Sequence, residues 1–144
     1  MLNGKELDLD ALDTGKGAEE GFALTLTHPK SGEPLPAKIT VLGAESDAYR
    51  SKQREFLRRS ADRVNRTRKL VVSPEELEAE ALELLVTATT GWDWGGMTLG
   101  GQPAPVFTHD AARQIYTRFG WIREQVDQAV GDRANFLPRS ASSS

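Results

Sequence analysis

The sequence contains no cysteine and only two histidines. Without cysteine the chain forms no disulfide and offers no thiolate to a metal, which fits a reducing cytosol. The histidines, His28 and His109, lie far apart, and no His-x-x-x-His spacing points to a zinc site. The sequence also lacks a Gly-x-Gly-x-x-Gly or Walker pattern, which argues against a phosphate-binding loop. We therefore predict no metal site and no cofactor.

The sequence has no recognisable catalytic constellation either. Carboxylates are abundant, but nothing in their spacing distinguishes a general acid from a general base. The carboxylates considered are Asp93, Asp110, Glu124 and Asp127. We predict that the protein is not an enzyme.

Long apolar runs are missing as well. No stretch approaches the roughly 18 apolar residues that a membrane span needs. The first residues, Met1 to Glu6, have neither the basic nor the apolar region of a secretory signal. With 144 residues, of which 38% are hydrophobic and 27% charged, the chain fits one domain with a modest core. We expect a single domain that is neither secreted nor embedded in a membrane.

The net charge of −3 hides an uneven distribution. Residues 50–69 hold nine basic side chains and two acidic ones, whereas the rest of the chain holds nine basic and nineteen acidic ones. Such a basic block attracts nucleic acid, an acidic partner or the chain's own acidic helix. The acidic remainder would repel a nucleic acid, so a solvated or partner-facing helix is the favoured interpretation.

The N-terminal third predicts a polar arm and a β-hairpin. Residues 1–20 are acidic and rich in glycine, and we interpret them as a short strand or a loose arm. From Phe22 to Thr27 apolar and small residues alternate, as in a half-buried strand. A turn rich in proline and glycine follows at residues 28–34, and the return strand ends at Gly43. We predict a hairpin over residues 21–43.

Helical patterns occupy most of residues 46–134. Ser46 is a plausible N-cap for a basic helix over 46–68, with Tyr49, Phe56 and Leu57 at helical spacing. Ser73-Pro74-Glu75-Glu76 has the form of a capping box, and the acidic helix that follows, with Leu77 in its apolar stripe, should end at Gly91. An antiparallel pair of these two helices would be electrostatically complementary.

A loop over 91–106 precedes two more helical segments. Thr108 should cap the first, Gly120 should interrupt it, and the second should end near Ala134. The predicted fold class is α+β, mainly α, with an N-terminal β-hairpin followed by about four helices in a small bundle. Residues 21–137 would form the domain, and 138–144 a disordered tail.

Three tryptophans leave two interpretations open. Trp92 and Trp94 flank Asp93 in a glycine-rich loop, and Trp121 follows Gly120. Their indoles either cover the edge of the core or stay partly exposed as anchors for a partner, since aromatic residues and arginine dominate binding energy at interfaces. We expect Arg123 and Glu124 on the outer face of their helix.

Short clusters of residues resemble a known family. Leu26-Thr27-His28-Pro29 and Val41-Leu42-Gly43 match its hairpin, and Trp92, Phe107-Thr108 and Ala111-Ala112 match the lead-in to its C-terminal signature. The closest matches are Trp121 to Val126 and Asp132 to Leu137. In these clusters the chain resembles the tail assembly chaperones of long-tailed, siphovirus-like bacteriophages. His109-Asp110 and the variable loop 91–101 depart from the pattern, so loop contacts are not transferred.

The resemblance implies a binding protein that acts in the bacterial host cytoplasm. Such chaperones, from phages and prophages, bind and solubilise the tape-measure protein, help to recruit tail tube subunits, and are not retained in the virion. The tape-measure and tail tube proteins are therefore the expected partners, and copies of the chain itself are a further candidate; a membrane is not expected. The residues we assign to partner binding are Trp92, Trp94, Trp121, Arg123, Gln125, Arg133, Phe136, Arg58 and Arg59.

Two alternatives from other classes stay open at this point. One is a minor structural protein of the virion or tail. The other is a small nucleic-acid-binding regulator that uses the arginine-rich helix of residues 50–69, because its cations would release counterions from a phosphate backbone.

Overall fold

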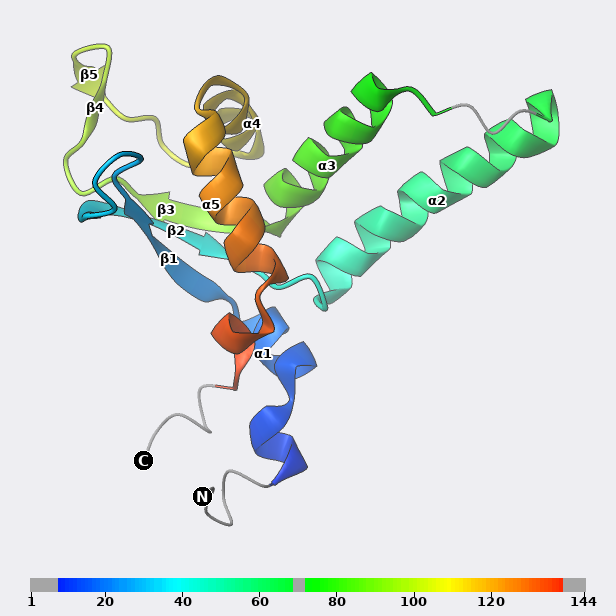
Figure 1. Ribbon diagram of the computed structural model, residues 1–144, viewed down its shortest axis with the longest axis horizontal. Helices are drawn as coiled ribbons and strands as arrows, with labels where there is room; N and C mark the ends of the chain where they lie inside the picture. The colour runs from blue at the N-terminus through cyan, green and yellow to red at the C-terminus, as the bar shows by residue number, and fades with distance from the viewer. Residues whose placement is uncertain (1–7, 69–71, 139–144) are drawn as a thin grey trace.

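A three-stranded antiparallel sheet forms the base of the fold. The structure is a computed structural model that describes residues 8–68 and 72–138. Strands β1 (Phe22–Thr27), β2 (Pro34–Val41) and β3 (Thr89–Asp93) lie in the order β1-β2-β3 (Figure 1). The predicted hairpin is confirmed by the pairing of β1 with β2, in which Leu24 lies opposite Ile39.

One face of this sheet is covered and the other meets solvent. Leu26 of β1 and Ile39 and Val41 of β2 are 0% exposed, while Lys38, which precedes Ile39 on β2, is exposed. This is the alternation expected of an antiparallel sheet with a single buried face. The residues that alternate with period two in the sequence therefore predict which face of the sheet the helices cover.

Five α-helices and two short 3₁₀-helices make up most of the rest of the described chain. They are η1 (Leu9–Leu12), α1 (Thr14–Glu20), α2 (Asp47–Thr67), α3 (Pro74–Ala88), α4 (His109–Arg118), α5 (Gly120–Gly131) and η2 (Arg133–Phe136). A small second sheet pairs β4 (Thr98–Leu99) with β5 (Gln102–Pro103).

Side-chain caps start three of the helices where the sequence predicts them. Ser46 Oγ accepts from the Tyr49 amide at 3.3 Å, and Thr108 Oγ1 accepts from the Ala111 amide at 2.9 Å. Ser73 Oγ accepts from the Glu76 amide at 3.1 Å. The carboxylate of Glu76 forms an ion pair with Arg63 at 2.5 Å instead of completing the capping box.

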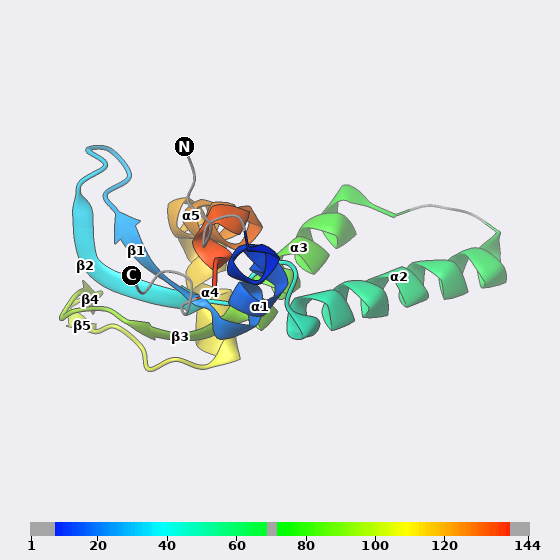
Figure 2. The same cartoon turned by 90° about the horizontal axis from the view of Figure 1, so that it is seen from below.

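The helices divide into a packed group and a projecting one. In Figure 1 α5 crosses the covered face of the sheet, contacts β1 and β2, and packs with α3 and α4. Helix α2 contacts α3 but projects away from the body in both views (Figures 1 and 2). The fold is therefore mixed α and β with a projecting helical arm, which agrees with the predicted class but is not a simple four-helix bundle.

A buried hydrogen bond joins α4 to the end of α3 at the centre of the core. The hydroxyl groups of Thr89 and Tyr116 lie 2.7 Å apart, and Thr89 Oγ1 also donates to the Leu85 carbonyl at 2.8 Å. Burial raises the pKa of Tyr116 to about 12, since it disfavours the phenolate. Both side chains are almost fully buried, and their mutual bond satisfies them.

The structure corrects several boundaries. Residues 8–20 hold η1 and α1 and do not form a strand or a loose arm, because Asp8 and Asp13 cap these helices through their side chains. Helix α3 ends at Ala88, and Gly91 lies inside β3, because residues 89–93 pair with the free edge of β2. The predictions for residues 1–7 and 139–144 lie outside the described residues.

Two further corrections concern exposure and helix ends. Leu57 and Leu77 have helical spacing typical of a core, yet they are 68% and 56% exposed, because α2 and α3 contact each other along other faces. The C-terminal helix ends at Gly131, and η2 follows it. The predicted break at Gly120 falls one residue earlier, at Phe119, which lies between α4 and α5. Pro138, at the start of the predicted tail, is buried.

Among the described residues, no helix combines the length and the apolar character that crossing a bilayer requires.

Candidate partner-binding site

The end of β3 and the hairpin that follows it carry an aromatic cluster, which we call the tryptophan corner. It consists of Trp92, Trp94, Met97, Leu99 and Phe107 together with Phe119 and Trp121. All seven side chains are partly buried and pack against the edge of the core. Trp92 lies in β3, and Trp94, which directly follows this strand, lies with Phe119 and Trp121 at the junction between α4 and α5.

Ring packing and one hydrogen bond fix the inner part of the corner. The Trp92 ring lies 5.3 Å from Trp94 and meets Phe107 edge-on at 5.2 Å. Its Nε1 donates to the Pro105 carbonyl at 3.0 Å. Trp92 is thus a structural residue that holds the segment before α4 against β3, which agrees with the core interpretation for this indole.

A tight turn shapes the outer part of the corner. Strands β4 and β5 are joined by Gly100 and Gly101, whose φ angles are 60° and 82°. A two-residue turn with positive φ at both positions matches the twist of a hairpin and favours glycine. This hairpin carries Leu99, and the glycine pair is the sequence signal that could have indicated it.

Between the hairpin and the α4–α5 junction lies a small apolar cavity of about 120 Å³. It is lined by Trp94, Met97, Leu99, Phe119, Trp121 and Ile122, among others. A cavity of about 150 Å³ with apolar walls binds benzene in a well-studied protein, so this one is close in size to a cavity that holds a single apolar side chain. The sequence predicted Trp94 and Trp121 as binding residues but missed Met97, Leu99 and Phe119.

One polar atom in the corner is left unsatisfied. Trp94 Nε1 is buried and finds no hydrogen-bond acceptor within the described part of the chain. A buried donor without an acceptor costs about 1–3 kcal/mol, and such groups in native proteins call for an explanation. An acceptor supplied by a bound partner would remove this cost.

Two residues assigned to partner binding have structural roles instead. The Gln125 amide accepts from the Thr27 amide and donates to the Thr27 carbonyl, both at 2.9 Å, and so joins α5 to the end of β1. Phe136 is 2% exposed and meets the Phe22 ring edge-on at 6.2 Å. Phe136 therefore belongs to the core, and its assignment to a partner surface is wrong, since a buried ring cannot contact a partner.

The basic residues of the C-terminal segment are tied to other elements. The Arg123 side chain is only 24% exposed and bonds the Glu78 carboxylate at 3.4 Å and its carbonyl at 3.3 Å. This corrects the expectation that Arg123 lies on an outer face, because α5 packs against α3 there. Arg133 is largely exposed and donates through Nε to Glu45 at 2.9 Å.

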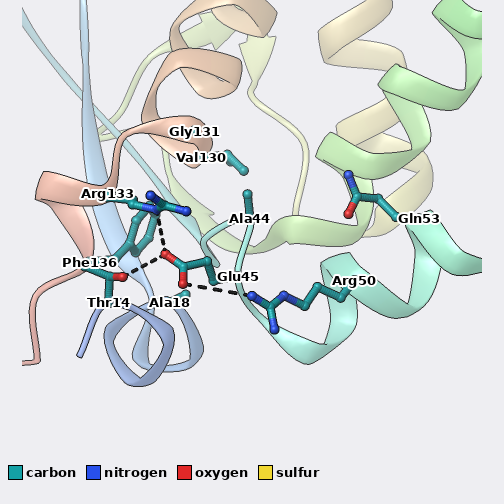
Figure 3. Close-up of a pocket in the computed structure, with 10 residues that line it drawn as sticks. All are labelled: Thr14, Ala18, Ala44, Glu45, Arg50, Gln53, Val130, Gly131, Arg133 and Phe136. Carbon is teal, nitrogen blue, oxygen red and sulfur yellow. Dashed lines mark hydrogen bonds and ion pairs between the residues drawn. The ribbon is translucent and has the colours of Figure 1, made fainter.

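Glu45 is the centre of the polar junction shown in Figure 3. It accepts from Thr14 Oγ1 at 2.7 Å and from Arg133, and Arg50 lies 4.0 Å away. The hydrogen bond from Thr14, followed by the two arginines, lowers the pKa of this carboxyl group. The adjoining pocket has a volume of about 450 Å³, with Gln53 also on its wall. Glu45 joins α1, α2 and η2, a role that the sequence did not reveal.

The remaining predicted residues, Arg58 and Arg59, lie on α2, far from the tryptophan corner. Arg59 pairs with Glu55 at 2.8 Å and lies over the Phe56 ring at 5.5 Å. Arg58 is exposed and has no hydrogen-bond or ion-pair partner within residues 8–68 and 72–138. The structure therefore separates the predicted binding residues into three regions.

The described residues contain no group of three or more His, Cys, Asp or Glu side chains that could hold a metal. Nδ1 of His28 accepts from the Lys30 and Ser31 amides in the hairpin turn, and His109 packs edge-on against Phe107. Of the carboxylates with lowered pKa, Glu83 is held by two bonds from Arg113 and Glu45 by Thr14 and Arg133. Both carboxylates act as ion-pair partners that join elements.

Comparison with family models, curated proteins and solved structures finds no match for this chain.

Proposed function

We propose that the protein is a tail assembly chaperone of a long-tailed bacteriophage. In this role it binds the apolar tape-measure protein in the bacterial cytoplasm, helps to recruit tail tube subunits, and leaves before the particle is complete. The support from the sequence is the resemblance of residues 107–137 and of the hairpin to that family. The support from the structure is the tryptophan corner.

The observation that carries the proposal is the apolar cavity beside an unsatisfied donor. The cavity admits one apolar side chain of a client, and Trp94 Nε1 lacks an acceptor in the described chain. A client segment that inserts a leucine or phenylalanine and offers a carbonyl oxygen to Nε1 would satisfy both features. Because Nε1 is buried, the atoms that cover it must move before a carbonyl of the client can reach it.

The size of the site suits repeated, reversible binding. Burial of one leucine or phenylalanine side chain contributes about 1.5–3 kcal/mol, which corresponds to weak affinity for each site. Many copies that each cover one apolar residue would shield a long client. Each copy could then leave as tube subunits arrive, because no single contact is strong.

Co-expression with a tape-measure gene tests the proposal. The wild-type chain is expected to keep the client soluble and to co-purify with it. The Leu99→Asp variant should lose this effect. An apolar side chain that binds in the cavity would remove water from the new carboxylate, and this desolvation costs free energy. The fraction of soluble client, measured by quantitative gel analysis, should fall at least about tenfold with L99D.

The matched control is Val106→Asp. Val106 belongs to the same segment and is 87% exposed, but it does not line the small cavity. V106D should keep the client soluble, and circular dichroism with thermal unfolding should show that both variants stay folded. A client that remains insoluble with the wild-type chain, or equal activity of L99D and V106D, contradicts the proposal. Mass spectrometry of purified particles distinguishes it from a retained virion protein.

A further inference from the structure

Strand β1 forms one edge of the three-stranded sheet. In Figure 1 it lies on the side of β2 away from β3, and β2 is the one strand that pairs with it among the described residues. An edge strand presents a row of main-chain N–H and C=O groups on which a further strand can pair. The side of β1 that faces away from β2 is therefore a candidate surface for another polypeptide.

The side chain of Gln125 occupies one end of this edge. Its Oε1 accepts from the Thr27 amide and its Nε2 donates to the Thr27 carbonyl, both at 2.9 Å. A primary amide holds a carbonyl oxygen beside N–H donors, as a peptide unit does. Two facing residues of an antiparallel ladder exchange the same two bonds. The edge of β1 therefore binds an amide group in the way that a neighbouring strand would bind it.

Strand geometry extends the outward orientation of Thr27 to Thr25 and Ala23. The main-chain groups of successive strand residues point alternately to the two sides, so residues two and four positions before Thr27 share its direction. The register irregularity lies in β2, which advances four residues from Lys38 to Pro34 while β1 advances two. Ala23 and Thr25 thus present main-chain groups that no strand pairs within residues 8–68 and 72–138.

A groove separates this edge from α5. We call it the β1–α5 groove; its volume is about 290 Å³, and Phe22, Leu24, Gln128 and Ala129 are among its lining residues. Phe22 and Leu24 are partly buried against the core, so they give the groove an apolar floor. A groove beside an edge strand suits an extended peptide, whose main chain bonds to the edge while alternate side chains enter pockets.

The end of the groove near the C-terminus of α5 is acidic. Asp132 lines the groove and is exposed. Helix α5 ends at Gly131, so the partial negative charge of the helix dipole adds to that of the carboxylate. The described residues that line the groove include no lysine or arginine. An occupant with a basic side chain at this end would therefore complement the groove.

From these observations we infer that the β1–α5 groove binds an extended segment of another protein, which adds to β1 as a fourth strand. The main chain of the segment pairs with Ala23 and Thr25. An apolar side chain of the segment packs on Phe22 and Leu24, and a basic side chain lies against Asp132.

The charge pattern distinguishes this occupant from a second copy of the chain. Strand β1, Phe22–Thr27, has no charged residue, so the same strand of a second copy would not supply the cation that Asp132 attracts. The inference goes beyond the proposed client binding, because the residues that line the groove differ from those that line the cavity of the tryptophan corner.

Selection from a displayed library of random seven-residue peptides tests the inference, with the purified full-length chain as bait. Seven extended residues span about 23 Å, enough to cover the edge of β1. The selected peptides should alternate apolar and polar residues and hold a lysine or arginine near one end. Calorimetry should give dissociation constants of about 100 μM or lower. A selection that yields no peptide binding more tightly than about 1 mM overturns the inference.

Two substitutions of Thr25 locate the peptide on the edge of β1. Thr25→Pro removes the outward N–H, and proline is tolerated on an edge strand where this group faces solvent. T25P should weaken peptide binding at least about tenfold, since a main-chain hydrogen bond is lost and the ring obstructs pairing. The matched control is Thr25→Val, which keeps the N–H and the branched shape and should bind within about twofold of the wild type. Equal affinities of T25P and T25V overturn the inference.

N-methylation of the peptide gives a second measurement that does not depend on how T25P folds. In a strand that adds to β1, alternate N–H groups point toward β1 and the others point toward solvent. Methylation of the first set should weaken binding at least about tenfold, and methylation of the second set should have little effect. Effects that do not alternate along the peptide overturn the inference, because they would show that side chains alone are recognised.

The acidic end of the groove is tested with Asp132→Asn. Asparagine keeps the cap of η2, in which the Asp132 side chain accepts from the Ala134 amide at 3.0 Å. D132N should weaken binding of a selected lysine-containing peptide about threefold in about 50 mM salt, but not binding of the same peptide with glutamine in place of lysine. Equal effects on both peptides overturn the assigned occupant.

Sedimentation velocity separates a second copy from another protein. Self-association of the wild-type chain that T25P abolishes and T25V retains would make a second copy the occupant of the edge, and would overturn the inference. Circular dichroism with thermal unfolding should show T25P, T25V and D132N to be folded. Peptide binding is measured without a client, and client solubility is measured separately, so the two proposals fail independently.

Discussion

At the scale of single residues, the close approach of two backbone segments requires glycine at a position that the composition does not reveal. Gly17 lies in α1, where a Cβ would overlap the Phe136 carbonyl oxygen of η2. Gly15, two residues earlier in the same helix, has only the Asp13 carboxylate and the Glu45 carboxylate within 4 Å. Both glycines look alike in the sequence, but only one of them lets α1 pack against η2.

The Gly17→Ala variant tests this difference. We expect it to lower the free energy of unfolding by about 2 kcal/mol or more, because backbone atoms must shift to admit the methyl group. Gly15→Ala should leave stability unchanged or raise it by about 0.5–1 kcal/mol, since alanine favours a helix. Urea unfolding followed by circular dichroism measures both; equal effects of the two substitutions would contradict the packing of α1 against η2.

At the scale of elements, ion pairs fix how the helices lie against one another. Arg113 of α4 binds Glu83 of α3 through Nε at 2.6 Å and Nη2 at 2.7 Å, a bidentate geometry. This pair lowers the pKa of Glu83 and raises that of Arg113. Both side chains are partly exposed, so solvent screens the interaction and limits its contribution.

Glu83→Gln should lower the free energy of unfolding by about 1 kcal/mol at neutral pH. The pKa of Glu83 is lower in the folded chain than in the unfolded one, so its contribution is complete above the unfolded value and is lost as the pH falls through the folded value. The stability difference between wild type and E83Q should therefore shrink below about pH 4.

Thermal unfolding across a pH series measures this difference. Glu80→Gln is the matched control, since Glu80 is on the same helix and no ion pair involves it among the described residues. A difference between wild type and E83Q that stays constant down to about pH 2 would show that the ion pair is not its source.

At the scale of the whole molecule, the body and the projecting α2 differ in how much they bury. Helix α5 contributes Ile122, Val126 and Val130 to the core, at 0–3% exposure. The outer half of α2 has no buried residue, and one ion pair, Arg63 with Glu76, joins it to α3. Local opening should therefore occur more easily in α2 than in the body.

Amide hydrogen exchange checks this expectation. Amides of residues 58–67 should exchange at least about tenfold faster than those of residues 122–130, because fewer buried contacts oppose opening of the outer part of α2. Equal protection of α2 and α5 in the dilute chain would contradict the division into body and projecting helix.

Local sequence patterns were sufficient to predict the hairpin, the caps at Ser46, Ser73 and Thr108, and the helices that follow these caps. These features depend on alternation, on side-chain oxygens next to free amides and on apolar spacing, all of which are local. The same patterns identified Trp94 and Trp121 as candidate binding residues. They did not show that Leu57 is exposed, because spacing gives the face of a helix but not whether another element covers it.

Only the tertiary structure decided where distant segments meet. β3 joined the sheet because β2 offered a free edge, and this pairing brought Trp94 next to Trp121 and formed the apolar cavity. Gln125 and Phe136 became structural for the same reason, since residues about 100 positions earlier met them. Contacts between residues far apart in the chain depend on the whole packing arrangement, which no local pattern contains.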